Sequence, residues 1–67
     1  MSVAKVTEIT AESTKSFEDA IREGISRAAK TLHNIESVSV QEQQVVIKDN
    51  KPQAYRVGMK VSFILKD

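Results

Sequence analysis

Three kinds of ligand-binding side chain lie between Glu42 and Arg56. Glu42 carries a carboxylate, the group that hard cations such as calcium and magnesium take as a ligand. Gln43 and Gln44 can donate and accept hydrogen bonds, and the planar guanidinium of Arg56 can stack on a ring or pair with a phosphate. One carboxylate in each chain is a weak cation site, so Glu42 would need its counterparts in symmetry-related copies.

Each of these residues also has a structural interpretation. Arg56 can form an ion pair between subunits, with Glu36 or Glu42 as its partner, and glutamines at a bend need no ligand. His33, the only histidine, is expected to cap helix carbonyls or to face solvent rather than to bind a metal. The residues alone leave both interpretations open.

The sequence contains no recognisable catalytic motif. Gly24 and Gly58 are the only glycines, so a Gly-rich phosphate-binding loop is excluded. No nucleophile and base stand at a recognised spacing, and the lack of cysteine removes disulfides and cysteine-based zinc sites. A catalytic centre would need residues from several subunits, and we therefore expect a protein that is not an enzyme.

Length and charge limit the remaining classes of function. The 67 residues make one domain, residues 1–67, and a chain of this size buries only roughly 60% of its unfolded surface. Oligomerisation is the expected means of stabilising so thin a core. The net charge of +1 gives no field that attracts nucleic acid or a membrane, and no apolar run approaches the ~20 residues that span a bilayer. We expect a cytoplasmic protein with neither partner.

The last strand is the longest predicted element. From Tyr55 to Leu65 every second residue is large and apolar, which is typical of a strand with one buried face. Met59 and Phe63 are predicted core residues, and Tyr55 is predicted to be buried with its hydroxyl on a partner. Arg56 falls on the opposite, mostly polar face. A strand this long needs more cover than one helix can give.

A helix is predicted from Phe17 to Leu32, where apolar residues recur at the spacing of one helical stripe. Ser13 or Thr14 is expected to cap its first N–H groups, and His33–Asn34 to end it. Gly24 lies on the apolar stripe, where a small residue lets a helix approach a sheet closely.

Two further strands complete a β-α-β-β order. They are predicted at Val3–Ile9 and Ser37–Lys48, with a turn at Asp49–Pro52 before the last strand. A change of phase within the second of them, between Val40 and Val45, indicates a β-bulge or a bend near Gln43. We expect an α+β fold in which a three-stranded antiparallel sheet, with the first strand beside the third, packs on one helix.

Four segments give nearly the whole chain a resemblance to the dodecins. The segments are Lys5-Val6, Ser13-x-x-Ser16-Phe17-x-x-Ala20-Ile21, Ser26 to Leu32 leading into Asn34-Ile35, and Tyr55-Arg56-Val57-x-Met59-x-Val61-Ser62-Phe63-x-Leu65. The usual Gly-Thr-Ser before the helix is Ala11-Glu12-Ser13 here. Dodecins are β-α-β-β proteins that assemble into hollow spheres of twelve identical subunits, so the resemblance implies a hollow homododecamer.

The resemblance also implies a ligand and its site. The best-known dodecins bind FMN, FAD or riboflavin, stacking the ring on tryptophans of symmetry-related subunits and hydrogen-bonding its edge to a glutamine. Here Ser37 stands at the tryptophan position and Arg56 at the glutamine position, and the chain has no tryptophan. Because stacking on an aromatic contributes about 1–3 kcal/mol per ring, the loss weakens flavin affinity by roughly tens to hundreds of fold.

The predicted ligand-binding residues are therefore Ser37, Glu42, Gln44 and Arg56. Glu42 falls where flavin dodecins often carry an acid that helps to hold the ligand chain or an associated cation. Some dodecins without the tryptophan resemble cation-binding shells, which makes Glu42 the predicted metal ligand for calcium or magnesium. Three alternatives stay open: a flavin-sequestering shell, a flavin-free shell that binds cations, and a purely structural oligomer.

Overall fold

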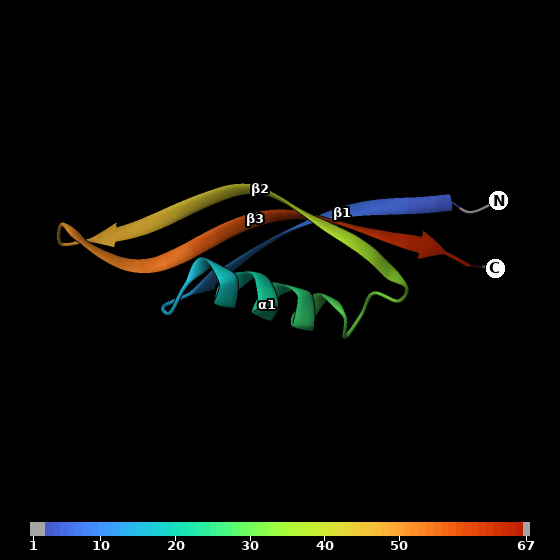
Figure 1. Cartoon of the computed structure of the whole chain (residues 1–67), viewed down its shortest axis with the longest axis horizontal. Coiled ribbons are helices and arrows are strands. Elements are labelled where there is room, and N and C mark those ends of the chain that lie inside the picture. Colours follow the sequence, from blue (N-terminus) through green and yellow to red (C-terminus); the bar gives the residue numbers. More distant parts are fainter. Residues whose placement is uncertain (1–2, 67) are drawn as a thin grey trace.

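The computed structural model describes residues 3–66, which form one helix and one antiparallel sheet (Figure 1). The elements are β1 (Val3–Ser13), α1 (Phe17–Ala28), β2 (Ile35–Lys48) and β3 (Lys51–Leu65). The strand order is β1-β3-β2, so β3 is central and both other strands are edges. The predicted α+β fold and the place of the first strand beside the third are confirmed. Over residues 3–66 the structure contains no helix with the length and apolar character needed to cross a membrane.

The core lies in the middle of β3, on the face that α1 covers. Val57, Met59 and Val61 are fully buried there, as the alternation of apolar residues predicts. The same alternation overstates burial at the strand end. Phe63 is only partly buried, and 49% of Leu65 is exposed, because α1 does not reach that far. Tyr55, at the other end of the run, is partly buried and packs edge-on against Phe17, with 5.1 Å between the ring centroids.

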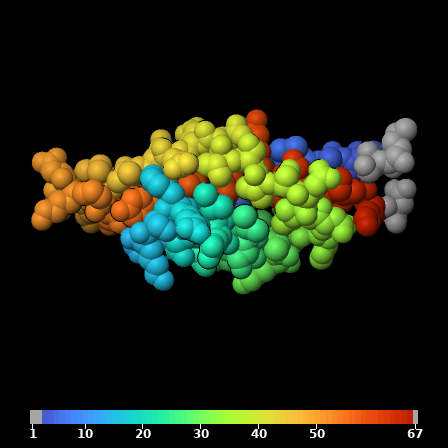
Figure 2. All heavy atoms as spheres, viewed as in Figure 1, coloured from blue at the N-terminus to red at the C-terminus, as the bar shows by residue number. Residues whose placement is uncertain are grey.

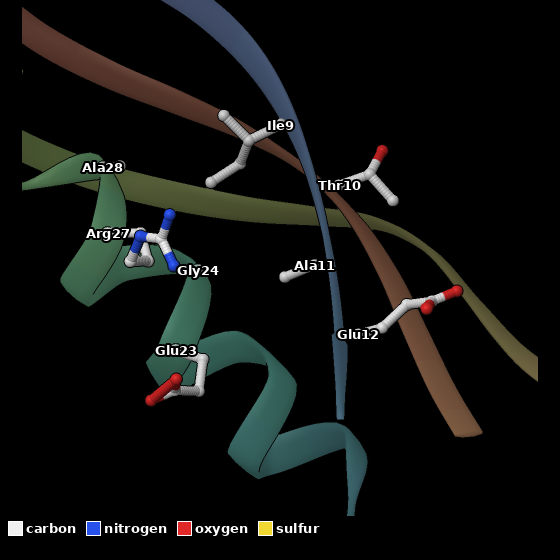
Figure 3. Close-up of a pocket in the computed structure, with 8 residues that line it drawn as sticks. All are labelled: Ile9, Thr10, Ala11, Glu12, Glu23, Gly24, Arg27 and Ala28. Carbon is white, nitrogen blue, oxygen red and sulfur yellow. The ribbon is translucent and has the colours of Figure 1, made fainter. Parts of the chain in front are cut away.

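Small residues let α1 lie close to the sheet (Figure 3). A Cβ added to Gly24 would stand 2.6 Å from the Cε of Met59 and 3.1 Å from the Cβ of Ala11. Ala20 and Ala28, on the same side of the helix, are buried as well. The predicted role of Gly24 in close packing is confirmed, and this contact offsets the low helix propensity of glycine.

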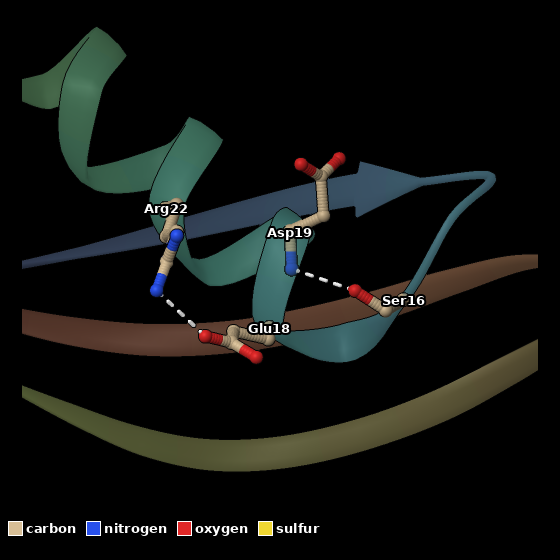
Figure 4. Close-up of polar contacts among 4 residues, drawn as sticks. All are labelled: Ser16, Glu18, Asp19 and Arg22. Atoms are coloured by element: carbon tan, nitrogen blue, oxygen red, sulfur yellow. Dashed lines mark hydrogen bonds and ion pairs between the residues drawn. The ribbon is translucent and has the colours of Figure 1, made fainter.

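The helix begins at Phe17 as predicted, but its N-cap and its last residue differ from those predicted. Its N-cap is Ser16, whose Oγ accepts the Asp19 N–H at 2.9 Å (Figure 4), so the prediction of Ser13 or Thr14 is wrong. Ser13 is instead buried at the end of β1, where its hydroxyl donates to Asp19 Oδ2 at 2.6 Å. The helix ends at Ala28, and turns carry the chain to Asn34 in the left-handed region.

A bulge in β2 explains the predicted change of phase. Val40 pairs with Met59 and Glu42 pairs with Gly58, which leaves Gln41 as the extra residue, two positions before the predicted Gln43. The bulge returns Val45 to the face of the sheet that carries Val57 and Met59. At the end of the hairpin, Asp49 and Asn50 both have positive φ, as a tight two-residue turn requires.

The sheet is longer than the helix that covers it. The described chain measures 51 × 19 × 14 Å, and the tip of the β2–β3 hairpin extends well beyond α1 (Figures 1 and 2). Apolar side chains are exposed at both ends of the sheet. They are Val45 and Ile47 near the tip, 42% and 56% exposed, and Val3, Val6 and Leu65 at the opposite end. One copy of the chain therefore leaves apolar surface without cover.

Candidate functional site

The four predicted ligand residues lie on one surface, the sheet face opposite α1. We call this surface the polar face. Side chains alternate along a strand, so Val57, Met59 and Val61 of β3 and the residues paired with them on β1 and β2 point to α1. The residues between them on each strand point away from the helix. The polar face carries Glu8, Thr10 and Glu12 of β1; Arg56, Gly58, Lys60 and Ser62 of β3; and Ser37, Ser39, Glu42 and Gln44 of β2. Figure 3 shows the alternation on β1, where Thr10 and Glu12 point away from the helix.

A shallow hollow of about 190 Å³ lies in the polar face at Gly58. Gly58 contributes no side chain, and a Cβ placed there would meet only the Cβ of Glu42, at 3.8 Å. The lining includes three of the predicted ligand residues, Glu42, Gln44 and Arg56, together with Glu8 and Thr10 from β1. The polar face thus brings a carboxylate, an amide and a guanidinium around a space that the missing side chain leaves open.

Strand register accounts for this grouping. Gln44 of β2 stands directly opposite Arg56 of β3, and Glu42 stands opposite Gly58. Without the bulge at Gln41, Glu42 and Gln44 would fall on the helix side of the sheet. The bulge therefore places both side chains on the polar face.

Arg56 pairs with an acid that the sequence analysis did not identify. Its Nε donates to Glu12 Oε1 at 2.6 Å, and its Nη2 lies 2.6 Å from the same oxygen. The predicted partners, Glu36 and Glu42, are on β2, whereas Glu12 is the residue directly opposite Arg56 on β1. The pair is therefore formed within one chain, and an ion pair of Arg56 with Glu36 or Glu42 of another subunit stays a prediction.

The charges around the hollow are mixed. A second pair between β3 and β1, Lys60 with Glu8, is longer at 4.0 Å between Nζ and Oε1. Glu42 has no ion pair within residues 3–66. Three carboxylates thus face two cationic groups in this part of the polar face, and the excess is negative.

Ser37 belongs to a different part of the polar face. It pairs with Ser62, which is six positions along β3 from Arg56, or roughly 20 Å at the rise of a strand. Ser37 is not among the residues that line the hollow. The two positions that the resemblance assigns to ring contacts can meet only across a contact between copies.

Three other cavities contain none of the four predicted residues, and one of them lies at the tip of the hairpin beside Asp49 and Pro52. Another, of about 510 Å³, runs between β1 and α1 with Glu23 and Arg27 on its helix side (Figure 3). The third, of about 360 Å³, lies beside His33 and Phe63. Within the described residues no three histidine, aspartate or glutamate side chains cluster as a metal site would require. A cation on Glu42 would consequently need ligands from other copies.

Sequence reasoning missed Glu12, Glu8, Thr10 and Gly58. The three β1 residues can be matched with their partners on β3 only once the β1–β3 register is known, and the sequence does not give that register. One signal was present: Glu12 stands where the dodecins usually have threonine. A charged residue at that point indicates a new partner for the residue across the strand pair.

Comparisons with known proteins agree on one family. The model of the dodecin family matches residues 3–66. A dodecin from Streptomyces davaonensis superposes with a TM-score of 0.93 at 36% identity, covering 98% of this chain and 97% of that one. A variant of the Thermus thermophilus dodecin gives a TM-score of 0.93 at 30% identity, with full coverage of both chains.

A third solved structure adds a ligand to the comparison. It is a calcium-chelating antigen from Mycobacterium tuberculosis, described as a calcium dodecin with a novel calcium-binding site. It superposes with a TM-score of 0.85 at 31% identity, covering 96% of this chain and 91% of that one. Comparison with curated proteins gave no match. The family model and the solved structures together show that this chain belongs to the dodecin family.

Proposed function

We propose that this protein is a non-enzymatic homododecameric shell that binds and sequesters a small planar ligand, flavin by family resemblance, on its polar face. One observation carries the proposal: Glu42, Gln44 and Arg56, three of the four residues at ligand-equivalent positions, line the same hollow at Gly58. The hollow offers hydrogen-bond donors from Arg56 and Gln44 to the polar edge of a ring. The proposal includes a cytoplasmic location, which fractionation of the source cells tests.

Two features support assembly as part of this function. The apolar side chains at both ends of the sheet are exposed in one chain, and contacts between copies would bury them. The roughly 20 Å between Ser37 and Arg56 along the sheet prevents one subunit from providing both ring-contact positions. The ligand site of the proposal is therefore shared between subunits, with the hollow of one chain facing Ser37 of another.

A fluorescence titration tests the flavin proposal. Riboflavin is fluorescent, and a ring held in a large assembled particle tumbles slowly, so binding raises its fluorescence anisotropy. We expect a saturable rise in the micromolar range, with an affinity at least tenfold weaker in Gly58→Val, whose side chain fills the hollow. Ser26→Val is the control, because it adds the same side chain at an exposed position of α1 outside the hollow. An assembled particle that gives no saturable rise would exclude flavin.

Cation binding is the second candidate function, favoured by a separate observation. Glu42 borders the hollow and has no ion pair within residues 3–66, so its carboxylate is available to a hard cation. The similarity to a calcium dodecin at 31% identity supports the same candidate. Calcium should then raise the melting temperature of the unmodified protein and leave that of Glu42→Gln unchanged, with Glu36→Gln as the control on the same strand. Equal shifts in all three would oppose it.

A further inference from the structure

The positive charge of Arg56 is paired with the carboxylate of Glu12 in the protein without a ligand. Two of its nitrogens, Nε and Nη2, lie 2.6 Å from Glu12 Oε1. The two side chains are exposed to similar extents, 44% for Arg56 and 45% for Glu12, so the pair lies at the surface of the polar face. Nη1 of Arg56 makes no hydrogen bond within residues 3–66, and its N–H groups remain for a ligand. Arg56 thus acts as a donor whose positive charge is already balanced.

The surroundings of the hollow strengthen this effect. Glu8 and Glu42 also line the space, and within residues 3–66 a second cation comes from Lys60, whose Nζ lies 4.0 Å from Glu8 Oε1. A phosphate entering here meets a carboxylate excess. An uncharged ring with carbonyl groups meets directed N–H donors without that repulsion.

From this balance we infer that Glu12 is a positioning residue that makes the site select an uncharged polar ring over the same ring bearing a phosphate. The inference deepens the proposed flavin-binding function and rests on it. Glu12 touches no ligand in this account. It holds the guanidinium of Arg56 in place and cancels its charge, and so determines which class of ligand the hollow accepts.

Riboflavin and FMN form the matched probe pair, because they share one ring system and differ by a phosphate. The ratio of their Kd values, measured by fluorescence anisotropy on assembled particles, isolates the effect of charge. The unmodified protein should bind riboflavin at least as tightly as FMN. In Glu12→Gln the charge of Arg56 is no longer balanced by a carboxylate, so the ratio should shift in favour of FMN by roughly 3- to 10-fold. The shift should be smaller at high salt, because salt screens the charge.

Two variants separate charge from structure. Glu12→Asp keeps the carboxylate and should keep the original ratio. Glu18→Gln removes the same charge from an exposed ion pair on α1, with Arg22 at 2.7 Å, and should leave the ratio unchanged. An unchanged ratio in Glu12→Gln, with riboflavin still bound, would overturn the inference and leave the flavin proposal intact. No riboflavin binding by the assembled unmodified protein would overturn both.

Assembly of Glu12→Gln is checked by light scattering before titration. If that variant does not assemble, the unmodified protein decides the question through its salt dependence. A balanced Arg56 predicts that FMN never binds more tightly than riboflavin, from low salt to about 0.5 M. A preference for FMN at low salt that disappears as salt rises would show a free positive charge and contradict the inference.

Discussion

Gly24 on α1 and Met59 on β3 lie so close that a Cβ on the glycine would stand 2.6 Å from the Met59 methyl. The Cβ of Ala11 would be 3.1 Å away. This contact fixes the distance between the helix and the sheet at the centre of the core, where Met59 is 2% exposed. The helix is therefore held against this face of the sheet, and the polar face lies on the other side.

The first prediction concerns that contact. Gly24→Val should lower the free energy of unfolding by about 1–3 kcal/mol, because a larger side chain overpacks the space against Met59 and Ala11. Gly58→Ala is the matched control, since its new Cβ would meet Glu42 at an ordinary 3.8 Å. Urea unfolding at one fixed protein concentration provides the comparison. A Gly24→Val protein as stable as the unmodified chain would disprove the close approach.

The second prediction concerns the start of the helix. Ser16→Ala should destabilise the protein by about 1 kcal/mol, because it removes the acceptor of the Asp19 N–H. Thr14→Ala should have little effect, because Thr14 is exposed and outside the cap. Thermal unfolding followed by circular dichroism measures both. A larger loss in Thr14→Ala than in Ser16→Ala would mean that the helix begins earlier than Phe17.

The third prediction concerns the apolar tip of the hairpin. Ile47→Glu should convert the assembled protein into smaller species, because 56% of this side chain is exposed in one chain and assembly would bury it. Gln53→Glu adds the same charge at an already polar, exposed position of the tip and should leave the particle intact. Light scattering reports the mass of each. An intact particle in Ile47→Glu would show that the tip lies outside the contacts between copies.

The fourth prediction restores the family's ring contacts. The double variant Ser37→Trp with Arg56→Gln should gain flavin affinity by roughly 10- to 100-fold through aromatic stacking. Ser39→Trp with Arg56→Gln is the control, because Ser39 lies on the same strand and face two positions away. Riboflavin quenching measures both. No gain in an assembled Ser37 variant would mean that the position assigned to the tryptophan is wrong.

Local patterns predicted the elements because each reports on a single strand or helix. The alternation from Tyr55 to Leu65 identified the central strand, and the loss of phase in β2 identified a bulge within two residues of Gln41. These signals can be read without knowing which strand or helix packs against the segment. The same limitation explains the errors at the ends: Phe63 and Leu65 fit the apolar pattern but extend beyond α1.

The site was only partly predictable because it depends on pairing between strands. Glu42, Gln44 and Arg56 came from residue types and from the family resemblance, and the structure places them around one hollow. Glu12 became visible only when β1 was aligned with β3, since 44 positions separate it from Arg56 in the sequence. The choice of Ser13 or Thr14 as the cap failed for a related reason, because β1 continues to Ser13 and delays the helix.

Native mass spectrometry of the protein mixed with riboflavin tests the central claim most directly, because one spectrum reports both the number of chains and the ligand bound to them. Twelve chains of 7.5 kDa make a particle of about 90 kDa, and the account predicts this particle with riboflavin bound in a saturable manner. A monomer or dimer would contradict the shell. A twelve-chain particle that takes up no riboflavin would contradict the flavin site.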